Sequence, residues 1–184
     1  MGDPKKKHKR FTTPRVPYDT EALTEELRII GAYGLRNKRE LWKAHTELST
    51  LRGRARDLLS LGLEEREIRE ANLIAKLYKR GLVMESSRLE DVLTLSVEDL
   101  LERRLQTYIL RRGLAQSLFQ ARQLISHGHI EINGRKVTSP SYQVRIEDEQ
   151  TLDYAKSSPM RSTDHPLRRD LEVEGAIAEE KSHE

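Results

Sequence analysis

Residues Glu102 to Val144 read ERRLQTYILRRGLAQSLFQARQLISHGHIEINGRKVTSPSYQV. The stretch combines two helical patterns, a glycine stop and an Asn-Gly turn between short apolar runs. Extended to Ile146, it carries eight basic residues against two acidic ones. It contains no arrangement of residues typical of a catalytic site. A compact basic unit of this kind is suited to holding a polyanion, and we expect that polyanion to be RNA.

The first helical pattern separates basic from apolar residues. Arg104, Thr107 and Arg111 fall at positions i, i+3 and i+7, and Arg103 borders this stripe. The sequence therefore predicts a helix that buries its apolar side and presents guanidinium groups, whose planar fork suits phosphate.

The second helical pattern follows Gly113. Its predicted buried side consists of Leu114, Leu118, Ala121 and Ile125. Gln116 and Gln123 point away from that side, and Phe119 lies off it beside Arg122. Phe119 has two interpretations: stacking on an unpaired base, or packing against the N-terminal helices. The second is favoured, because most aromatic side chains are structural.

A glycine stop and a hairpin follow the second helix. Gly128 suits the left-handed position after a last helical turn, and His127 and His129 beside it are candidates for phosphate or ribose contact. They are a poor zinc pair, because no further ligands lie at suitable spacing.

Asn133-Gly134 favours a type I′ turn. The resulting register pairs Ile132 with Arg135, Glu131 with Lys136, and Ile130 with Val137. This register agrees with the residue types: it places Ile130 and Val137 together on the core face and Glu131 opposite Lys136 on the other face. Residues 143–146 are predicted to form a last short strand.

Charge divides the rest of the chain into three segments. Residues 1–17 form a basic arm, 18–101 a nearly neutral helical domain, and 157–184 an acidic, weakly ordered tail. The arm cations are Lys5, Lys6, Lys7, Lys9 and Arg10. We favour an arm that orders on phosphate over a solvated tail or a nuclear-address mimic. The acidic tail fits contact with a basic neighbouring protein and simple solubility equally well.

The helical domain is predicted from caps and apolar spacing. Thr20 is expected to cap a helix over 21–30, an Asn37–Glu40 capping box to start a second helix, and a Ser96–Asp99 capping box to start the helix that enters the basic module. A third helix, 64–80, is expected to bury a side made of Ile68, Ala71, Ala75 and Tyr78, flanked by Leu73 and Leu77, and to end at Gly81. Arg52, Arg54 and Arg56 surround Gly53, which permits close approach of a partner or marks a kink.

Composition excludes several classes of function. The 184 residues include no cysteine, so disulfides, thiol chemistry and Cys-ligated zinc are excluded, and a reducing cytosolic compartment fits. No apolar run approaches the length of a membrane span, and no signal peptide is evident. We expect no metal, no cofactor, no membrane partner, no small-molecule substrate and no enzymatic activity.

The motifs ERRLQT, ARQLISHGHI, NG and PSY in residues 102–156 resemble the S4 RNA-binding domain. With SVEDLLERRLQT and the N-terminal helices, about residues 10–155 resemble the small-subunit ribosomal protein S4 family of the archaeal and eukaryotic type. The resemblance implies a mainly α, α+β fold: a helical N-terminal domain plus a small domain of two helices packed on a short antiparallel sheet. Some bacterial relatives carry an N-terminal zinc site of cysteines, which this chain cannot form.

The resemblance further implies a primary binder of small-subunit (16S) rRNA. Such a protein binds the 5′ domain near a multi-helix junction, nucleates assembly of the subunit body in the cytoplasm, contacts ribosomal protein S5 and other small-subunit proteins, and contributes to translational accuracy. Carried over to matching positions, its RNA face includes Arg103, Arg104, Arg111, Arg112, Gln116, Ser117, Arg122, Gln123, His127, His129, Arg135 and Lys136. The patterns above add the arm cations, the arginines around Gly53, Thr107 and Phe119.

Other classes of protein use the same small domain. It is appended to RNA-modifying enzymes and a tRNA synthetase, and it occurs in ribosome-rescue and heat-shock RNA binders. The remainder of this chain offers neither a Gly-rich nucleotide loop nor a nucleophile constellation, and it is short for a catalytic domain. A pure interaction protein that binds partner helices is a further alternative, and it predicts no dependence on RNA.

Overall fold

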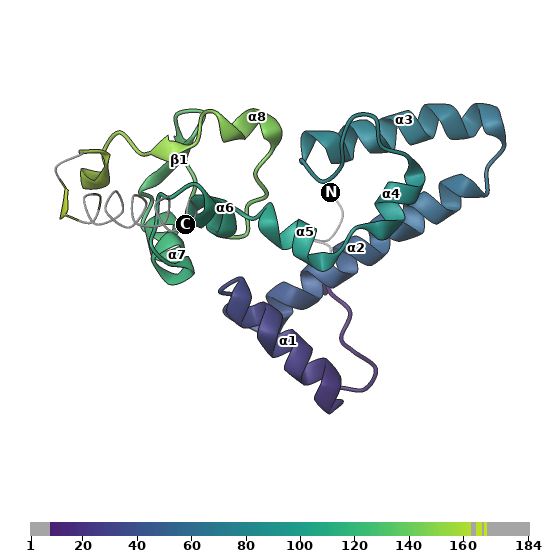
Figure 1. The fold of residues 1–184 in the computed structure, drawn as a ribbon, viewed down its shortest axis with the longest axis horizontal. Helices are drawn as coiled ribbons and strands as arrows, with labels where there is room; N and C mark the ends of the chain where they lie inside the picture. Colours follow the sequence, from purple (N-terminus) through teal and green to yellow (C-terminus); the bar gives the residue numbers. More distant parts are fainter. Residues whose placement is uncertain (1–7, 163–164, 167, 169–184) are drawn as a thin grey trace, which may run out of the picture.

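A computed structural model of the chain describes residues 8–162, 165, 166 and 168 (Figure 1). The helices are α1 (Thr20–Ala32), α2 (Lys38–Leu59), α3 (Leu63–Lys79), α4 (Leu89–Thr94), α5 (Val97–Glu102), α6 (Leu105–Arg111), α7 (Leu118–Ser126), α8 (Ile146–Glu149) and the 3-10 turn η1 (Pro159–Arg161). The strands are β1 (Ile130–Ile132), β2 (Arg135–Lys136) and β3 (Asp153–Tyr154). The mainly helical α+β class is confirmed.

The elements form two halves joined end to end (Figure 1). The helical half contains α1 to α5, with α1 projecting away from the pair α2 and α3. The sheet half contains α6, α7, α8 and the three strands, and α5 leads into it from the helical half. Arg103 and Arg104 lie at the junction, between the end of α5 and the start of α6.

Capping residues set the starts of the helices. Asp19, not Thr20, caps α1, because its carboxylate accepts the Glu21 backbone N–H at 3.2 Å. The prediction for Thr20 is therefore wrong by one residue. The Ser96–Asp99 capping box of α5 is confirmed.

Helix α3 buries the flank of the predicted side, and the residues predicted at its centre are exposed. Its buried residues are Leu73 and Leu77, which pack with α2 and α4, whereas Ile68 is 68% exposed and Tyr78 is exposed as well. The apolar residues of α3 extend over two sides, and the position of α2 decides which side is covered. The stop at Gly81 is confirmed by its positive φ of 68°.

The sheet half contains an antiparallel sheet of strand order β2-β1-β3. The predicted pairing of Ile132 with Arg135 is confirmed, and both turn residues have positive φ, 51° at Asn133 and 73° at Gly134. The predicted Glu131–Lys136 charge pair is not formed: the Glu131 carboxylate accepts the backbone N–H of Lys156 instead.

The last strand lies further along the chain than predicted. Residues 146–149 form α8, a helical turn at whose start the Asp148 carboxylate accepts the Arg145 backbone N–H at 3.3 Å. Tyr154 in β3 pairs with Ile130 in place of the expected strand. Gln143 forms only an isolated bridge with Arg104.

Candidate nucleic-acid interface

The predicted stripe of Arg104, Thr107 and Arg111 does not form one exposed face. The chain leaves helical geometry at residues 103 and 104, so Arg104 precedes α6 as its N-cap instead of lying within a continuous helix. Arg104 is 7% exposed and Thr107 is 3% exposed. Arg111 is on the surface, where Glu102 binds its guanidinium at 2.9 Å and 3.3 Å. The prediction of an outward-facing stripe is therefore wrong for Arg104 and Thr107.

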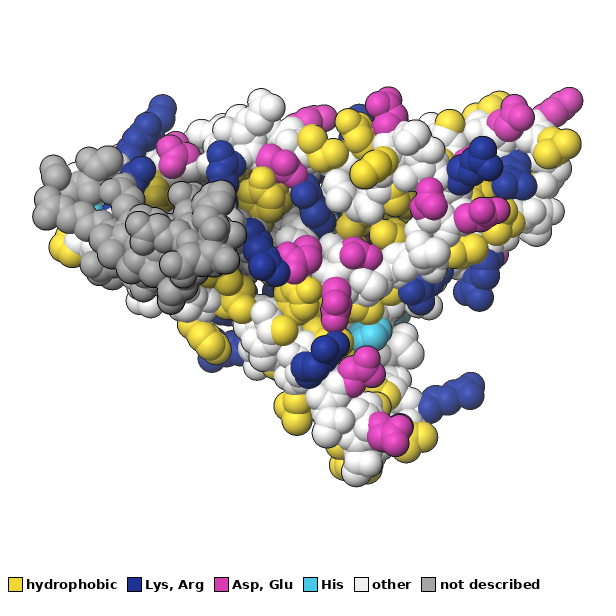
Figure 2. Space-filling model, in the orientation of Figure 1, with side chains coloured by type: hydrophobic (Ala, Val, Ile, Leu, Met, Phe, Trp, Pro, Cys, Tyr) yellow, Lys and Arg dark blue, Asp and Glu magenta, His cyan; other side chains and the backbone are white. Residues whose placement is uncertain are grey.

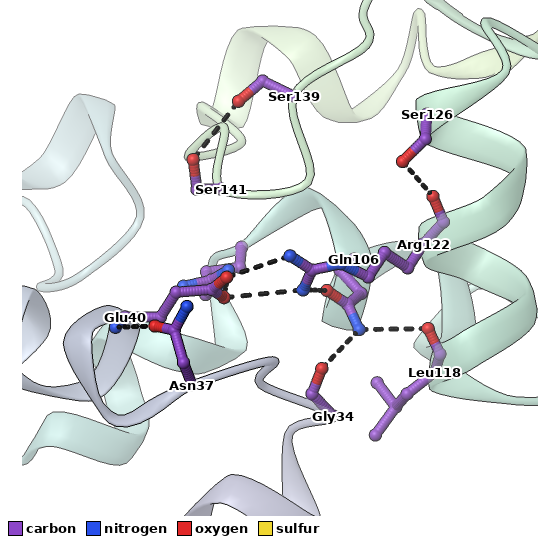
Figure 3. Close-up of polar contacts among 10 residues, drawn as sticks. Gly34, Asn37, Glu40, Gln106, Leu118, Arg122, Ser126, Ser139 and Ser141 are labelled. Atoms are coloured by element: carbon purple, nitrogen blue, oxygen red, sulfur yellow. Dashed lines mark hydrogen bonds and ion pairs between the residues drawn. The ribbon is translucent and has the colours of Figure 1, made fainter.

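Arg104 and Arg122 converge on one carboxylate of the helical half. Figure 3 shows Arg122 reaching the Glu40 carboxylate. Glu40 Oε2 lies 2.8 Å from Arg104 Nη2, and Glu40 Oε1 lies 2.9 Å from Arg122 Nη2. Gln106 continues the contact, since its amide donates to the backbone oxygens of Gly34 and Leu118, each at 3.0 Å. Arg122 also donates to the Gln106 side-chain oxygen at 3.3 Å. We call Glu40, Arg104, Gln106 and Arg122 the Glu40 cluster.

Electrostatics in the Glu40 cluster favour the ionised pair. Burial alone raises the pKa of Glu40, but the hydrogen bond from Arg122 and the charges of Arg104 and Arg122 outweigh burial and hold that pKa below its ordinary value. Burial lowers the pKa of Arg104, while Glu40 opposes that change. The two arginines therefore keep Glu40 ionised at the junction.

Arg103 forms a second link between the halves. Its Nε donates to the backbone oxygen of Arg80 at 3.1 Å, and its Nη2 donates to Val144 O at 3.0 Å and to a Glu149 carboxylate oxygen at 2.5 Å. The guanidinium lies against Gly81, where an added Cβ would come within 2.5 Å of Arg103 Cζ. Gly81 is therefore needed both for its positive φ and for this close approach.

A third link runs through α2. The Arg80 guanidinium donates to the side chains of both Glu47 and Gln143, and the Gln143 amide donates to Glu47 at 3.3 Å. Glu40 and Glu47 are seven residues apart, so they lie on one face of α2 toward the sheet half. This face is a feature that the sequence analysis missed, although the i, i+7 spacing of the two acids was available.

A cleft of about 340 Å³ opens between the halves beside the Glu40 cluster, with Arg10, Lys43 and Ser141 in its wall. A second hollow of about 410 Å³ adjoins it along α2, where Arg10, Lys43 and Arg54 contribute cations. Lys43 belongs to both and was not singled out from the sequence. Figure 2 shows that acidic side chains are interspersed with basic ones on the face it presents, so the charge there is mixed.

Several of the predicted RNA-binding residues lie on the surface of the sheet half. Exposed there are Arg112, Gln116, Ser117, Phe119, Gln123, His127, Arg135 and Lys136. Phe119 is 76% exposed, so packing against the N-terminal helices, the favoured interpretation, is wrong. Ser117 also caps α7, since its hydroxyl accepts the Gln120 backbone N–H at 3.2 Å.

Two histidines border a hollow of about 450 Å³ that Gln120, Gln123, Leu124 and Met160 also line. His127 is exposed, and His129 is half-buried with its Nδ1 at 2.9 Å from the Ser158 hydroxyl. Gly128 between them has a φ of 73°, as predicted. Lys136 approaches this glycine turn from the hairpin. Across residues 8–162, 165, 166 and 168, no group of three potential metal ligands is found.

The predicted cations of the helical half are in different situations. Lys9 lies 4.7 Å from the centre of the Phe11 ring, and Arg52 donates to the backbone oxygen of Leu95 at 2.5 Å. Arg54 and Arg56 are exposed, and a Cβ added at Gly53 would contact nothing within 4 Å. Lys5, Lys6 and Lys7, and most of the acidic tail, lie outside the described residues. None of the helices in the described part has the length and apolar character needed to cross a bilayer.

Comparison with known proteins covers nearly all of this architecture. The S4 domain family matches residues 103–149, which include the junction arginines, α6, α7 and the hairpin. The small ribosomal subunit protein uS4 of Ignicoccus hospitalis is 54% identical over 159 residues, 86% of this chain and 96% of the relative. The proteins of the same name from Hyperthermus butylicus and Saccharolobus solfataricus are 51% and 47% identical, over 86% and 88% of this chain and 90% of each relative.

Proposed function

Since this chain belongs to the uS4 family of small ribosomal subunit proteins, we propose that it is a structural constituent of the small ribosomal subunit and binds the rRNA of that subunit. The observation that carries this proposal is the extent of the similarity. It covers 86% of this chain and 96% of the Ignicoccus relative, so it includes the helical half as well as the S4 domain.

The surface supports an RNA partner. The sheet half presents cations, amides, imidazoles and one exposed aromatic ring, which are the groups that contact phosphate, ribose and unpaired bases. The cleft with Arg10 and Lys43 adds positive charge on the side of the helical half. We assign rRNA binding to these exposed groups, and a supporting role at the junction to Arg103, Arg104 and Arg122.

Finer roles follow from the family resemblance. We propose that the protein binds the 5′ domain of the rRNA, nucleates assembly of the subunit body in the cytoplasm, and contributes to translational accuracy through contact with ribosomal protein S5. We further propose the division into a basic arm (1–17), a helical domain (18–101), an S4 domain (102–156) and an acidic tail (157–184). The arm is expected to add affinity, and the S4 domain specificity.

An S4 domain attached to an RNA-modifying or ribosome-rescue protein is the alternative. The relatives are ribosomal proteins by name along nearly their whole length, which supports a structural role over an enzymatic one.

Equilibrium binding to a 5′-domain fragment of small-subunit rRNA tests the proposal, with a structured RNA of equal length as the control, across a salt series. We expect a strong preference for the cognate fragment that persists at high salt. Equal binding to both RNAs that salt abolishes would contradict the proposal, because counterion release alone would then account for the affinity.

A further inference from the structure

We propose that Glu40 is a positioning residue for RNA binding: by holding Arg104 and Arg122 together, it fixes the sheet half against the helical half and aligns the two parts of the RNA-binding surface. The inference rests on the proposed function and adds to it an acidic residue that contacts no RNA. Figure 3 shows the juxtaposition of Glu40 from α2 with Arg122 from α7 and Gln106 from α6.

The Glu40 side chain does not cap the start of α2. Asn37 caps α2, with its side chain accepting the Glu40 backbone N–H at 3.2 Å. In a capping box the glutamate would return a hydrogen bond to the backbone of Asn37. Instead, Glu40 Oε2 accepts from Arg104 at 2.8 Å and Oε1 accepts from Arg122 at 2.9 Å, with a longer contact of 3.5 Å from Arg122 to Oε2. The predicted capping box is thus only half formed, and the carboxylate is committed to the junction.

Among the described residues, the two halves share no buried apolar cluster that could replace the Glu40 cluster, although Leu118 packs closely against Gly34 across the junction. Among the described residues, the buried apolar cluster of the sheet half draws only on residues from Leu105 onward. The two clusters of the helical half draw only on residues up to Leu101. No buried apolar cluster of the described part therefore spans both halves, and their relative orientation depends largely on directional polar contacts.

Burial makes these contacts strong and makes Glu40 hard to replace. The side chains of Arg104, Glu40 and Arg122 are 9%, 17% and 23% exposed. Without the carboxylate, two guanidinium groups would face one another in a site with little solvent, and one of them would have to move. The sheet half would then sample other orientations, and only a fraction of molecules would present the aligned surface. Apparent affinity falls in proportion to that fraction.

The substitution Glu40→Gln separates positioning from simple electrostatics by the sign of its effect. It removes a negative charge and keeps the size of the side chain, so attraction to a polyanion alone predicts tighter RNA binding. Positioning predicts weaker binding. The matched control is Glu65→Gln, which removes one charge from an exposed pair with Arg69 on α3, away from the junction.

The experiment measures binding of the full chain to the 5′-domain fragment and, separately, the distance between the halves. Because the chain has no cysteine, Glu67→Cys on α3 and Thr138→Cys after the hairpin place two spin labels specifically. We expect Glu40→Gln to raise the Kd for the 5′-domain fragment about tenfold, because about a tenth of the molecules would then hold the halves in the orientation that binds RNA. We also expect it to broaden the distribution of distances between the two labels. Glu65→Gln should do neither. A Glu40→Gln protein that binds as tightly as the wild type, with an unchanged distribution, overturns the inference.

A second variant covers the case in which Glu40→Gln fails to fold. Arg104→Lys preserves net charge but loses the planar fork that fits the carboxylate, and the buried Arg104 cannot reach RNA in this structure. We expect weaker binding and a broader distribution again, and unchanged values for both would count against the inference. If the wild type shows no preference for the cognate RNA, the proposed function fails, while the distance measurement still decides whether Glu40 fixes the halves.

Discussion

The junction between the halves and the tip of the hairpin use arginine in opposite ways. At the junction, Arg104 is 7% exposed and bound to Glu40. At the hairpin, Arg135 is exposed, and no ion pair is found for it among the described residues. In the first environment the protein itself neutralises the charge, and in the second the charge is available to a partner. A dense run of basic residues can therefore serve the fold and the ligand at the same time.

Solvent explains why the two regions differ in energy as well as geometry. A guanidinium at the junction has lost its hydration, and only its interaction with Glu40 offsets that cost in free energy. Substitution of either partner should therefore destabilise the protein. A guanidinium on the hairpin keeps its water and contributes little to stability until a phosphate replaces that water. The comparison therefore predicts that junction variants lose stability first and that hairpin variants lose only RNA binding.

The largest expected effect is on stability at the junction. Arg104→Ala leaves the Glu40 carboxylate with one arginine in place of two, and we expect it to lower the free energy of unfolding by about 3 kcal/mol. Arg135→Ala should change it by less than about 0.5 kcal/mol. Urea unfolding of the two variants measures both values. Similar losses of unfolding free energy in the two variants would mean that Arg104 stabilises the protein no more than the exposed Arg135 does.

The second prediction compares two glycines with similar positive φ. Gly134→Ala should cost about 1–2 kcal/mol for the left-handed backbone alone, because an added Cβ meets nothing nearby. Gly81→Ala should cost at least about 1 kcal/mol more, since its Cβ would displace the guanidinium of Arg103, which three acceptors hold in place. Thermal unfolding gives the difference, and equal costs would show that Arg103 moves aside freely.

The third prediction concerns pH. The pKa of Glu40 is lowered in the folded protein, so its ionisation contributes stability that is fully present above the unfolded value of about 4.3. That contribution is lost as the pH falls through the lowered pKa of the folded state. The difference in unfolding free energy between wild type and Glu40→Gln should therefore be constant near neutral pH and shrink below about pH 4.3. A difference that does not change with pH would mean that the charge of Glu40 is irrelevant to stability.

Local rules predicted local structure well. The Asn133-Gly134 turn fixes a two-residue hairpin, and the Ser96–Asp99 box starts a helix, because each depends on residues close in sequence. The position of Phe119 off the buried stripe of α7 was correctly predicted from helical spacing. The interpretation of that position was wrong, because the exposure of a helix face depends on where the other half lies.

The junction could not be predicted from local patterns. Arg104 and Thr107 have the spacing of an exposed helical stripe, but the chain breaks its helix before Leu105, and Glu40, 64 residues away, captures the guanidinium. Residues 143–146 were predicted as a strand from their composition, but Asp148 starts a helical turn there. Both errors come from contacts between residues distant in sequence or from a capping group beyond the expected element.

The fourth prediction tests the exposed ring. Phe119→Ala should leave stability within about 0.5 kcal/mol of the wild type, because the ring is 76% exposed. If the ring stacks on a base, the variant should lose about 1 kcal/mol of cognate RNA binding. Phe119→Trp is the control, since it keeps a stacking surface and should retain that binding. Unchanged binding by the Ala variant would remove Phe119 from the RNA face.

The smallest single effects are expected at the hairpin, and they appear in the salt dependence of binding. Each phosphate contact that is lost should lower the slope of log K against log salt by about 0.7–0.9. Arg135→Ala and Lys136→Ala should each lower it by roughly that amount, because both side chains are exposed and lie on successive residues of β2. Their effects should add in the double variant, since neither side chain supports the other.

Glu40→Gln should behave differently: by our inference it weakens cognate binding through orientation, so cognate RNA should lose far more affinity than an unrelated RNA. A hairpin variant that loses specificity without a change in slope would show that β2 acts by orientation too, and the contrast between the two regions would then fail.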